Sequence, residues 1–203
     1  MSHVFNHGVE EAIRKLEDPN RRKIYDPLSL LRRSGLVTGH IIADLGCGTG
    51  FFSLPAAKIV GDHGVVYAID EVHEMLQVLE TKISEQGIQN VRTMKSNLLA
   101  TTIPNQSVDF VLMACVFHDL HRETLGAELN RILKSTGTIC VVDWKKIPTE
   151  HGPPVEVRLT EEDVIREIND MGFTNSEVYE AGQQHYGIVI HKSSISDNSL
   201  QDD

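Results

Sequence analysis

Residues 44–50 read Asp-Leu-Gly-Cys-Gly-Thr-Gly, and this short stretch decides the fold. The apolar run 41–43 precedes it and predicts a buried strand, whereas residues 51–60 follow it with the pattern of a helix that ends at Gly61. A glycine-rich turn between a strand and a helix is typical of parallel α/β sheets, in which ligands bind beyond the carboxyl ends of the strands. The turn therefore predicts the class of fold and the place of a ligand site together.

Strand and helix patterns alternate along the rest of the chain. Strands are expected at 65–69, 91–95, 108–116 and 138–142, and helices at 72–85, 122–133 (stopping near Gly137) and 160–171. Two more strand patterns, 176–180 and 186–191, are separated only by 181–185, which permits an antiparallel pair but no parallel crossover. The order predicts a doubly wound α/β fold with a mostly parallel, seven-stranded sheet and an antiparallel last strand.

The chain divides into three expected segments. Residues 1–38 form an N-terminal extension with helical patterns, residues 39–192 form the α/β domain, and residues 193–203 form a polar, disordered tail. Basic residues gather in the extension, at Arg21, Arg22, Lys23, Arg32 and Arg33. The preferred interpretation of this cluster is a solvated helix face. The alternative is a docking patch for a protein or RNA partner.

The composition is that of an ordinary globular protein with an acidic balance. Among 203 residues, Lys and Arg number 19 and Asp and Glu number 29, which gives a formal net charge of −10. Such a chain is a poor general ligand for nucleic acids and anionic membranes. It contains no apolar run that would span a bilayer and no signal-peptide pattern at its N-terminus. We therefore expect a cytoplasmic protein without a membrane partner, in which the three cysteines are reduced.

The spacing of the glycines discriminates between cofactors. A dinucleotide site requires a third glycine where this chain has Phe51, and a P-loop requires a Gly-Lys-Ser/Thr end that is absent. The free N–H groups at the start of the helix favour an anionic group such as a carboxylate. Asp70 ends the second strand, 20 residues after Gly50, where a carboxylate can accept both ribose hydroxyls of a nucleoside.

Four stretches together resemble the class I S-adenosylmethionine-dependent methyltransferases. They are the turn 44–50, the run Val66-Tyr67-Ala68-Ile69-Asp70, the triplet Ser96-Asn97-Leu98 and the run Val108-Asp109-Phe110-Val111. The resemblance spans about residues 38–192, and the antiparallel last strand is that family's own variation on the Rossmann fold. It implies S-adenosylmethionine (SAM) as the cofactor and methyl transfer as the reaction.

The resemblance also implies roles for individual residues. The loop backbone would hold the methionine part of the cofactor, and Asp44 would pin the loop and reach the amino group. Asp70 would bind the ribose, and Asn97 with the Leu98 N–H would contact the adenine. Relatives often carry Asp where Asn97 stands, so the Asn amide must turn its oxygen to the adenine amino group. The full expected cofactor set is Asp44, Gly46, Cys47, Gly48, Thr49, Gly50, Asp70, Glu71, Met75, Ser96, Asn97, Leu98 and Cys115.

Within the class, the chain resembles the small-molecule branch that contains quinone C-methyltransferases and arsenite methyltransferases. Arsenite chemistry needs converging thiolates, but Cys47, Cys115 and Cys140 lie in or beside different expected strands. The quinone enzymes have a larger N-terminal cap than this extension. RNA-methylating branches often carry Asn/Asp-Pro-Pro-Tyr/Phe where residues 114–119 read Ala-Cys-Val-Phe-His-Asp. A small-molecule acceptor is therefore expected, and its identity and reacting atom stay open.

The expected chemistry is an in-line displacement in which the protein aligns the acceptor and excludes water. His118 is the candidate base, because it follows the fourth strand at the ligand edge; the alternative is that it only shapes the pocket. Tyr25, Phe117 and Trp144 are candidate substrate residues, and the N-terminal helices are expected to form a lid, as in relatives. His118 and His121 lack the further ligands of a metal site, so no metal is expected.

Three other functions compete with this interpretation. The protein could methylate a protein or RNA docked on the basic extension, or could bind the cofactor without catalysis. A nicotinamide oxidoreductase is disfavoured by Phe51 and by the final strand pair. The sequence leaves the oligomeric state open.

Overall fold

The computed structural model describes residues 8–192, apart from the side chains of residues 22 and 23. The expected tail 193–203 and the first seven residues of the expected extension lie outside the described residues. Within the described range, no helix is both long and apolar enough to cross a membrane.

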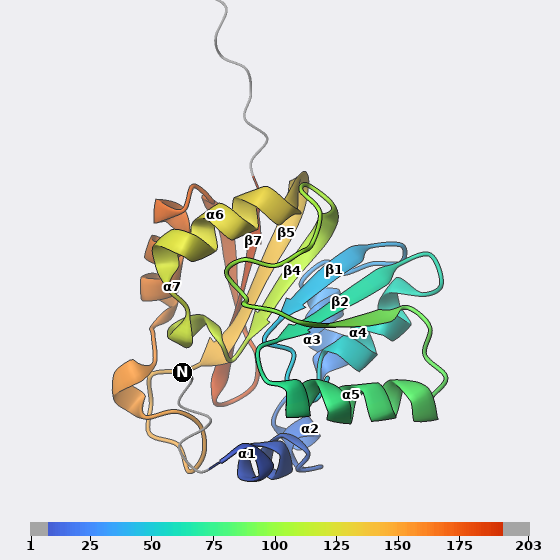
Figure 1. The fold of residues 1–203 in the computed structure, drawn as a ribbon. Helices are drawn as coiled ribbons and strands as arrows, with labels where there is room; N and C mark the ends of the chain where they lie inside the picture. Colours follow the sequence, from blue (N-terminus) through green and yellow to red (C-terminus); the bar gives the residue numbers. More distant parts are fainter. Residues whose placement is uncertain (1–7, 193–203) are drawn as a thin grey trace, which may run out of the picture.

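A single seven-stranded sheet forms the centre of the molecule, in the order β3-β2-β1-β4-β5-β7-β6 (Figure 1). Its strands are β1 Ile41–Leu45, β2 Val65–Asp70, β3 Val91–Lys95, β4 Val108–Ala114, β5 Leu133–Trp144, β6 Asn175–Glu180 and β7 His185–His191. The pairs β1–β2, β2–β3, β1–β4 and β4–β5 are parallel, whereas β7 is antiparallel to both β5 and β6. The predicted fold class is confirmed, including the reversal at the end of the chain.

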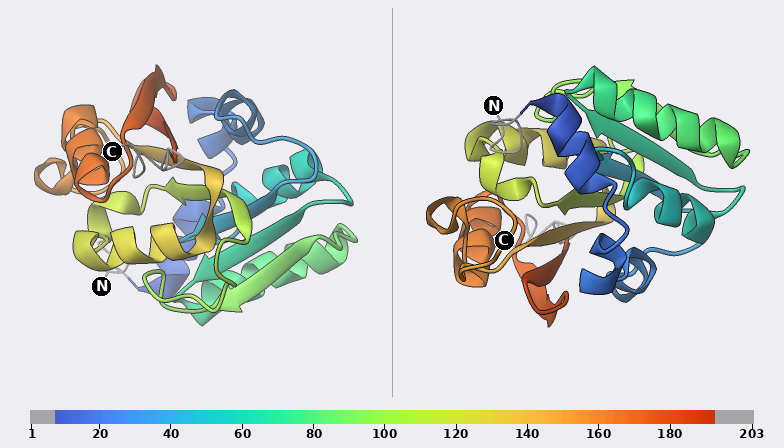
Figure 2. Two further views of the ribbon diagram at one scale, coloured as in Figure 1. Left: turned by 90° about the horizontal axis from the view of Figure 1, so that it is seen from above. Right: turned by 90° about the horizontal axis from the view of Figure 1, so that it is seen from below.

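Helices cover both faces of the sheet because side chains alternate along each central strand. On one face, α6 (Arg122–Ile132) and α7 (Glu161–Asp170) pack against inward residues such as Val111 and Ile139. On the other face, α3 (Pro27–Arg33) and α4 (Ser53–Val60) pack against Phe110 and its neighbours. Figure 2 shows these two pairs of helices on opposite sides of the sheet. The helix α5 (His73–Glu85) packs on Ala68 of β2.

One predicted boundary is wrong. The helix expected over 122–133 ends within one residue of its expected end, at Ile132, but the strand expected to begin at Thr138 begins at Leu133. Leu133 is fully buried, has extended backbone angles (φ −79°, ψ 131°) and pairs with Val108. A Cβ atom at Gly137 would lie 2.5 Å from Leu133 Cγ, so a larger residue at this position would clash with the buried Leu133 side chain. Burial of Leu133 against β4 thus starts the strand earlier than expected.

The N-terminal segment packs along the domain. It consists of α1 (Val9–Leu16), the single turn α2 (Arg21–Ile24) and α3, which the Asp26 side chain caps. The Ser34 hydroxyl after α3 lies 2.7 Å from the Tyr179 hydroxyl of β6. Figure 1 shows α1 and α2 below the edge at which the parallel strands end. The segment therefore reaches the edge where a ligand is expected.

Candidate functional site

The glycine-rich loop between β1 and α4 is folded back on the end of β2. The N–H groups of Gly46 and Cys47 both donate to the Ile69 carbonyl, each at 2.9 Å. Gly46, Gly48 and Gly50 have φ values of +77°, +53° and +87°, a region that costs other residues backbone strain. The glycines therefore allow a tight turn whose backbone N–H groups hold it against the end of β2.

Gly46 is also required by its surroundings. A Cβ atom there would lie 2.9 Å from Val116 Cγ2, in the segment that continues from β4. The loop after β1 and the segment after β4 are thus in direct contact at the point where the strand order reverses. In open α/β sheets this reversal is where ligands bind.

Asp70 ties the glycine loop to the start of α5. Its Oδ2 accepts a hydrogen bond from the Gly48 N–H at 2.8 Å, and its Oδ1 accepts one from the Val72 N–H at 2.9 Å. Burial raises the pKa of this carboxyl, while the two backbone N–H groups act in the opposite direction. Each carboxylate oxygen keeps a second lone pair for a ligand. This arrangement fits the two hydroxyls of a ribose.

Asp44 is a buried acid at the end of β1. It is 2% exposed, and its Oδ2 accepts a hydrogen bond from the Ser53 hydroxyl at 2.5 Å. Burial raises the pKa of Asp44 to about 7, and the nearby charge of Asp70 acts in the same direction. A cation beside this carboxyl would favour its ionised form. The pair of acids therefore fits a cofactor that carries positive charge and a ribose, as SAM does.

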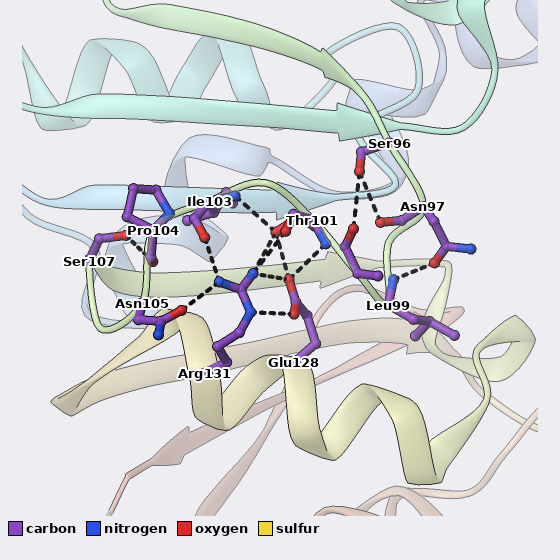
Figure 3. Close-up of polar contacts among 11 residues, drawn as sticks. Ser96, Asn97, Leu99, Thr101, Ile103, Pro104, Asn105, Ser107, Glu128 and Arg131 are labelled. Atoms are coloured by element: carbon purple, nitrogen blue, oxygen red, sulfur yellow. Dashed lines mark hydrogen bonds and ion pairs between the residues drawn. The ribbon is translucent and has the colours of Figure 1, made fainter.

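Asn97 is held by its own turn after β3. Its Oδ1 accepts a hydrogen bond from the Leu99 N–H at 2.8 Å, as Figure 3 shows. The Ser96 N–H donates to the Asp70 carbonyl at 3.2 Å, which places this turn beside the ribose-binding acid. The oxygen keeps a second lone pair, so its presentation to an adenine amino group stays a prediction. The amide nitrogen donates to no acceptor within residues 8–192.

A buried ionic network fixes the rest of this loop to α6 (Figure 3). Glu128, 5% exposed, accepts from the Thr101 N–H at 2.9 Å and from the Thr101 hydroxyl at 2.6 Å. Arg131 pairs with Glu128 at 2.7 Å and donates to the Ile103 carbonyl at 2.6 Å. The loop 96–107 thus owes its position to two side chains of one helix.

We expect Glu128→Ala to destabilise the protein by about 3 kcal/mol, because the buried Thr101 N–H loses its acceptor and Arg131 loses its partner. Urea unfolding followed by circular dichroism measures this change. Glu123→Ala, at an exposed position of the same helix, is the matched control and should change stability by less than about 0.5 kcal/mol. Equal midpoints for the two variants would contradict the role of the network.

His118 forms a buried pair with an acid that sequence reasoning did not select as its partner. The His118 Nδ1 lies 3.0 Å from Asp143 Oδ1, and both side chains are 3% exposed. Burial lowers the pKa of His118, but the hydrogen bond and charge of Asp143 outweigh it and the net shift is upward. The parallel register pairs Ala114 of β4 with Val142 of β5, so residues just beyond these strands meet at the edge. The signal available in the sequence was that His118 and Asp143 each follow an expected strand, 108–116 and 138–142.

The expected substrate residues lie in different surroundings. Tyr25 is 7% exposed. The centre of its ring lies 5.5 Å from that of Phe51 and 5.9 Å from that of Phe52, the two residues that directly follow the glycine loop. Trp144 is half-buried at the end of β5. Phe117 is fully buried in the main core cluster, so it supports the site from inside, and its contact with a substrate stays a prediction.

The remaining expected cofactor residues also differ in burial. Met75 is 1% exposed and faces the interior, whereas Glu71 is exposed beside Asp70. Cys115 follows β4 with φ +56°, an uncommon angle for a residue other than glycine, and its N–H donates to the Val142 carbonyl at 2.7 Å. Leu98 is 6% exposed, so only its backbone is well placed to meet a ligand. None of these positions tests the expected contacts directly.

The three thiols are free and kept protonated by burial. Burial raises the pKa of Cys115 to about 12 and that of Cys140 to about 11. Cys140 lies in the cluster formed with α3 and α4, while Cys47 packs with α5. Thiolate chemistry on a shared metalloid is not supported by this distribution.

The end of α1 contacts the glycine loop through a cluster that the sequence did not predict. The Thr49 hydroxyl donates to Glu17 Oε1 at 2.5 Å, and Lys82 of α5 donates to the same oxygen at 2.6 Å and to the Thr49 carbonyl at 3.0 Å. The Arg21 guanidinium lies 4.2 Å from the centre of the Phe51 ring. The N-terminal helices thus cover part of the loop, as a lid would.

Comparison with known proteins defines the class of this fold and site. Residues 42–137 match the methyltransferase domain family. The crystal structure of a SAM-dependent methyltransferase from Aquifex aeolicus has a TM-score of 0.86 and 34% sequence identity, over 91% of this chain and 98% of that one. Geranyl diphosphate methyltransferase in complex with SAM, at 16% identity and a TM-score of 0.71, shares the fold over 93% of both chains. The chain belongs to the SAM-dependent methyltransferase family, and its cofactor is SAM.

Two curated relatives have a named reaction. Demethylmenaquinone methyltransferase of Geobacillus stearothermophilus is 29% identical over 123 residues, which are 60% of this chain and 53% of that protein. A ubiquinone/menaquinone biosynthesis C-methyltransferase of Marinomonas sp. is 28% identical over 122 residues, 59% of this chain and 49% of that protein. The chain spans about half the length of these relatives.

Proposed function

We propose that this methyltransferase acts on a small, flat acceptor of the quinone type, at the carboxyl edge of β4 and β5. The observation that carries the proposal is the aromatic wall beside the glycine loop, in which Tyr25 packs on Phe51 and Phe52. Such a wall favours an apolar ring over a polar chain. The names of the curated relatives support the same class of acceptor.

The geometry of the loop supports an assignment of the cofactor residues. We assign the ribose to Asp70, the cationic end of SAM to Asp44, and the carboxylate end to the turn 46–50. The amide of Asn97 and the backbone of Leu98 are assigned to the adenine. Bound SAM supplies a methyl group activated by its sulfonium. The chain then has to align the acceptor and exclude water, which together can lower a barrier by about 7–11 kcal/mol.

His118 is assigned the role of the base. Asp143 holds the Nδ1 side of the imidazole, so Nε2 is the atom that can take a proton from an acceptor hydroxyl. The imidazole accepts a proton only when it is neutral. Because the pKa of His118 is raised above the usual value for histidine, base catalysis requires a correspondingly higher pH. The lid role of residues 1–38 and a cytoplasmic location, which the free thiols support, are part of the same proposal.

The alternative of a protein or RNA acceptor docked on the basic segment has weaker support. Arg21 donates to the Leu16 carbonyl at 2.8 Å and covers Phe51, and the Arg33 guanidinium lies 4.7 Å from the centre of the Tyr179 ring. Both cations have contacts within the chain, although Arg33 itself is exposed.

The test is methyl transfer from labelled SAM. Purified protein is incubated with demethylmenaquinol and, separately, with the lipid and the macromolecular fractions of a bacterial extract. Label in demethylmenaquinol or in the lipid fraction is expected. Label confined to protein or RNA would replace this proposal by the alternative.

A further inference from the structure

His185 is a buried histidine at the ligand edge whose ring has no polar partner among the described residues. Because β7 runs antiparallel to β5, its first residue lies where the parallel strands end, and His185 pairs in register with Trp144. The side chain is fully buried, and neither Nδ1 nor Nε2 has a hydrogen-bond partner within residues 8–192. Buried polar atoms are normally paired, so these two atoms require an explanation.

Aromatic rings flank His185 and connect it to the glycine loop. Its ring centre lies 4.6 Å from that of Tyr25 and 4.1 Å from that of Trp144. Tyr25 in turn contacts Phe51 and Phe52, which directly follow the loop. The histidine is therefore the polar member of the same aromatic wall that runs along the carboxyl edge.

The charges around His185 come from four elements or segments. Asp143 of β5 attracts a proton to the ring, whereas Arg21 of α2, Arg158 ahead of α7 and Lys145 after β5 repel one. Burial is the largest effect, and the pKa of His185 is lowered to about 4. At neutral pH the ring is uncharged, with one nitrogen as a donor and the other as an acceptor.

We propose that His185 binds the methyl acceptor, by hydrogen bonding to a hydroxyl or carbonyl oxygen of a flat ring seated on the wall formed with Tyr25 and Trp144. This inference rests on the proposed function. A hydroxyl group matches the ring well, because it can accept from one imidazole nitrogen or donate to the other. His185 also lies beyond residues 42–137, the part shared with the methyltransferase domain family. The acceptor-binding residue thus belongs to the segment that this family match does not include.

A purely structural histidine predicts that its replacement leaves acceptor binding unchanged. If the ring only fills space between Tyr25 and Trp144, then phenylalanine would fill it as well without two unpaired nitrogens. His185→Phe is therefore expected to raise the melting temperature under either account, and only acceptor binding separates them. His40→Phe is the matched control, because His40 also has a buried, unpaired Nδ1 but precedes β1 at the opposite edge.

The experiment measures binding of 1,4-naphthalenediol, under anaerobic conditions, to protein saturated with S-adenosylhomocysteine. For His185→Phe we expect the Kd of the diol to rise at least tenfold, with SAM affinity within twofold of wild type. In wild type, the imidazole ¹⁵N resonances of His185 should shift on addition of the diol, and His40→Phe should bind the diol normally. Unchanged diol affinity in His185→Phe, or no diol binding by wild type, would overturn the inference.

The transfer assay separates this inference from the proposed function. Demethylmenaquinol methylation by wild type together with a large loss in His185→Phe supports both. Methylation at the wild-type rate by His185→Phe contradicts the role of His185 and leaves the proposed function intact. Absence of methylation by wild type contradicts the proposed function, while diol binding still reports on His185.

Discussion

Replacing Asp44 by Asn is expected to stabilise the ligand-free protein at pH 8 and to weaken SAM binding at least tenfold. The buried Asp44 carboxyl, with its pKa raised to about 7, is ionised at pH 8 without a cation beside it. Because its pKa is near 3.8 in the unfolded chain, stability declines as the pH rises between these two values and stays low above about 7. Asn keeps the shape and the acceptor for Ser53, so about 2 kcal/mol should be regained at pH 8 and almost nothing at pH 4.

The same carboxylate favours a cationic cofactor, so loss of the charge should weaken SAM. In wild type, SAM affinity should fall as the pH drops below about 7, because the carboxyl must then release a proton on binding. Urea unfolding at both pH values and calorimetry with SAM measure these effects. Asp62→Asn, at an exposed position after α4, is the control. Unchanged stability at pH 8 together with unchanged SAM affinity would refute this account of Asp44.

Asp143→Asn is expected to destabilise the protein by about 3 kcal/mol at pH 6, because His118 then loses its buried charge partner. The folded-state pKa of His118 lies above its usual 6.5, so the pair stabilises the fold fully below that pH. The contribution disappears as the pH rises through the raised value. The stability difference between wild type and Asp143→Asn should therefore shrink toward pH 9, as denaturant unfolding across this range will show.

The variant also tests His118 as the base. Without the Asp143 charge, the pKa of His118 should fall, so the acid limb of the pH–rate profile should move to lower pH. Asp119→Asn is the comparison variant: Asp119 lies 3.8 Å from the other ring nitrogen, is more exposed and has a smaller effect on the pKa of His118, so the limb should move in the same direction by less. A profile that stays in place in Asp143→Asn would mean that His118 only shapes the pocket.

Local patterns carried the prediction of the fold. The strand–turn–helix at 41–60 and the short connection 181–185 determine the parallel centre and the antiparallel end, because both depend on neighbouring residues. The predicted start of β5 was wrong because burial of Leu133 against Val108 decides it, and the two residues are far apart in sequence. Contacts between residues of neighbouring strands were not predicted, because these residues are also far apart in sequence.

The site residues also fall into two groups, those that local spacing predicts and those that depend on the order of the strands. The glycine loop and Asp70 were visible because their spacing is local, and the structure joins them through the Gly48 N–H. The pairing of Asp143 with His118 and the position of His185 required the order β4-β5-β7. The hydrogen bond from the Leu99 N–H to the Asn97 oxygen is local, but it was not predicted from the sequence.

The most direct test of the central claim is the SAM affinity of Asp70→Ala. The account predicts a loss of about a hundredfold by calorimetry, because hydrogen bonds to a charged acceptor contribute about 1.5–3 kcal/mol each. Asp109→Asn, at the start of β4 and away from the ligand edge, should bind SAM as wild type does. Equal SAM affinity in Asp70→Ala and wild type, with both variants folded, would contradict the claim that the cofactor lies between the glycine loop and the end of β2.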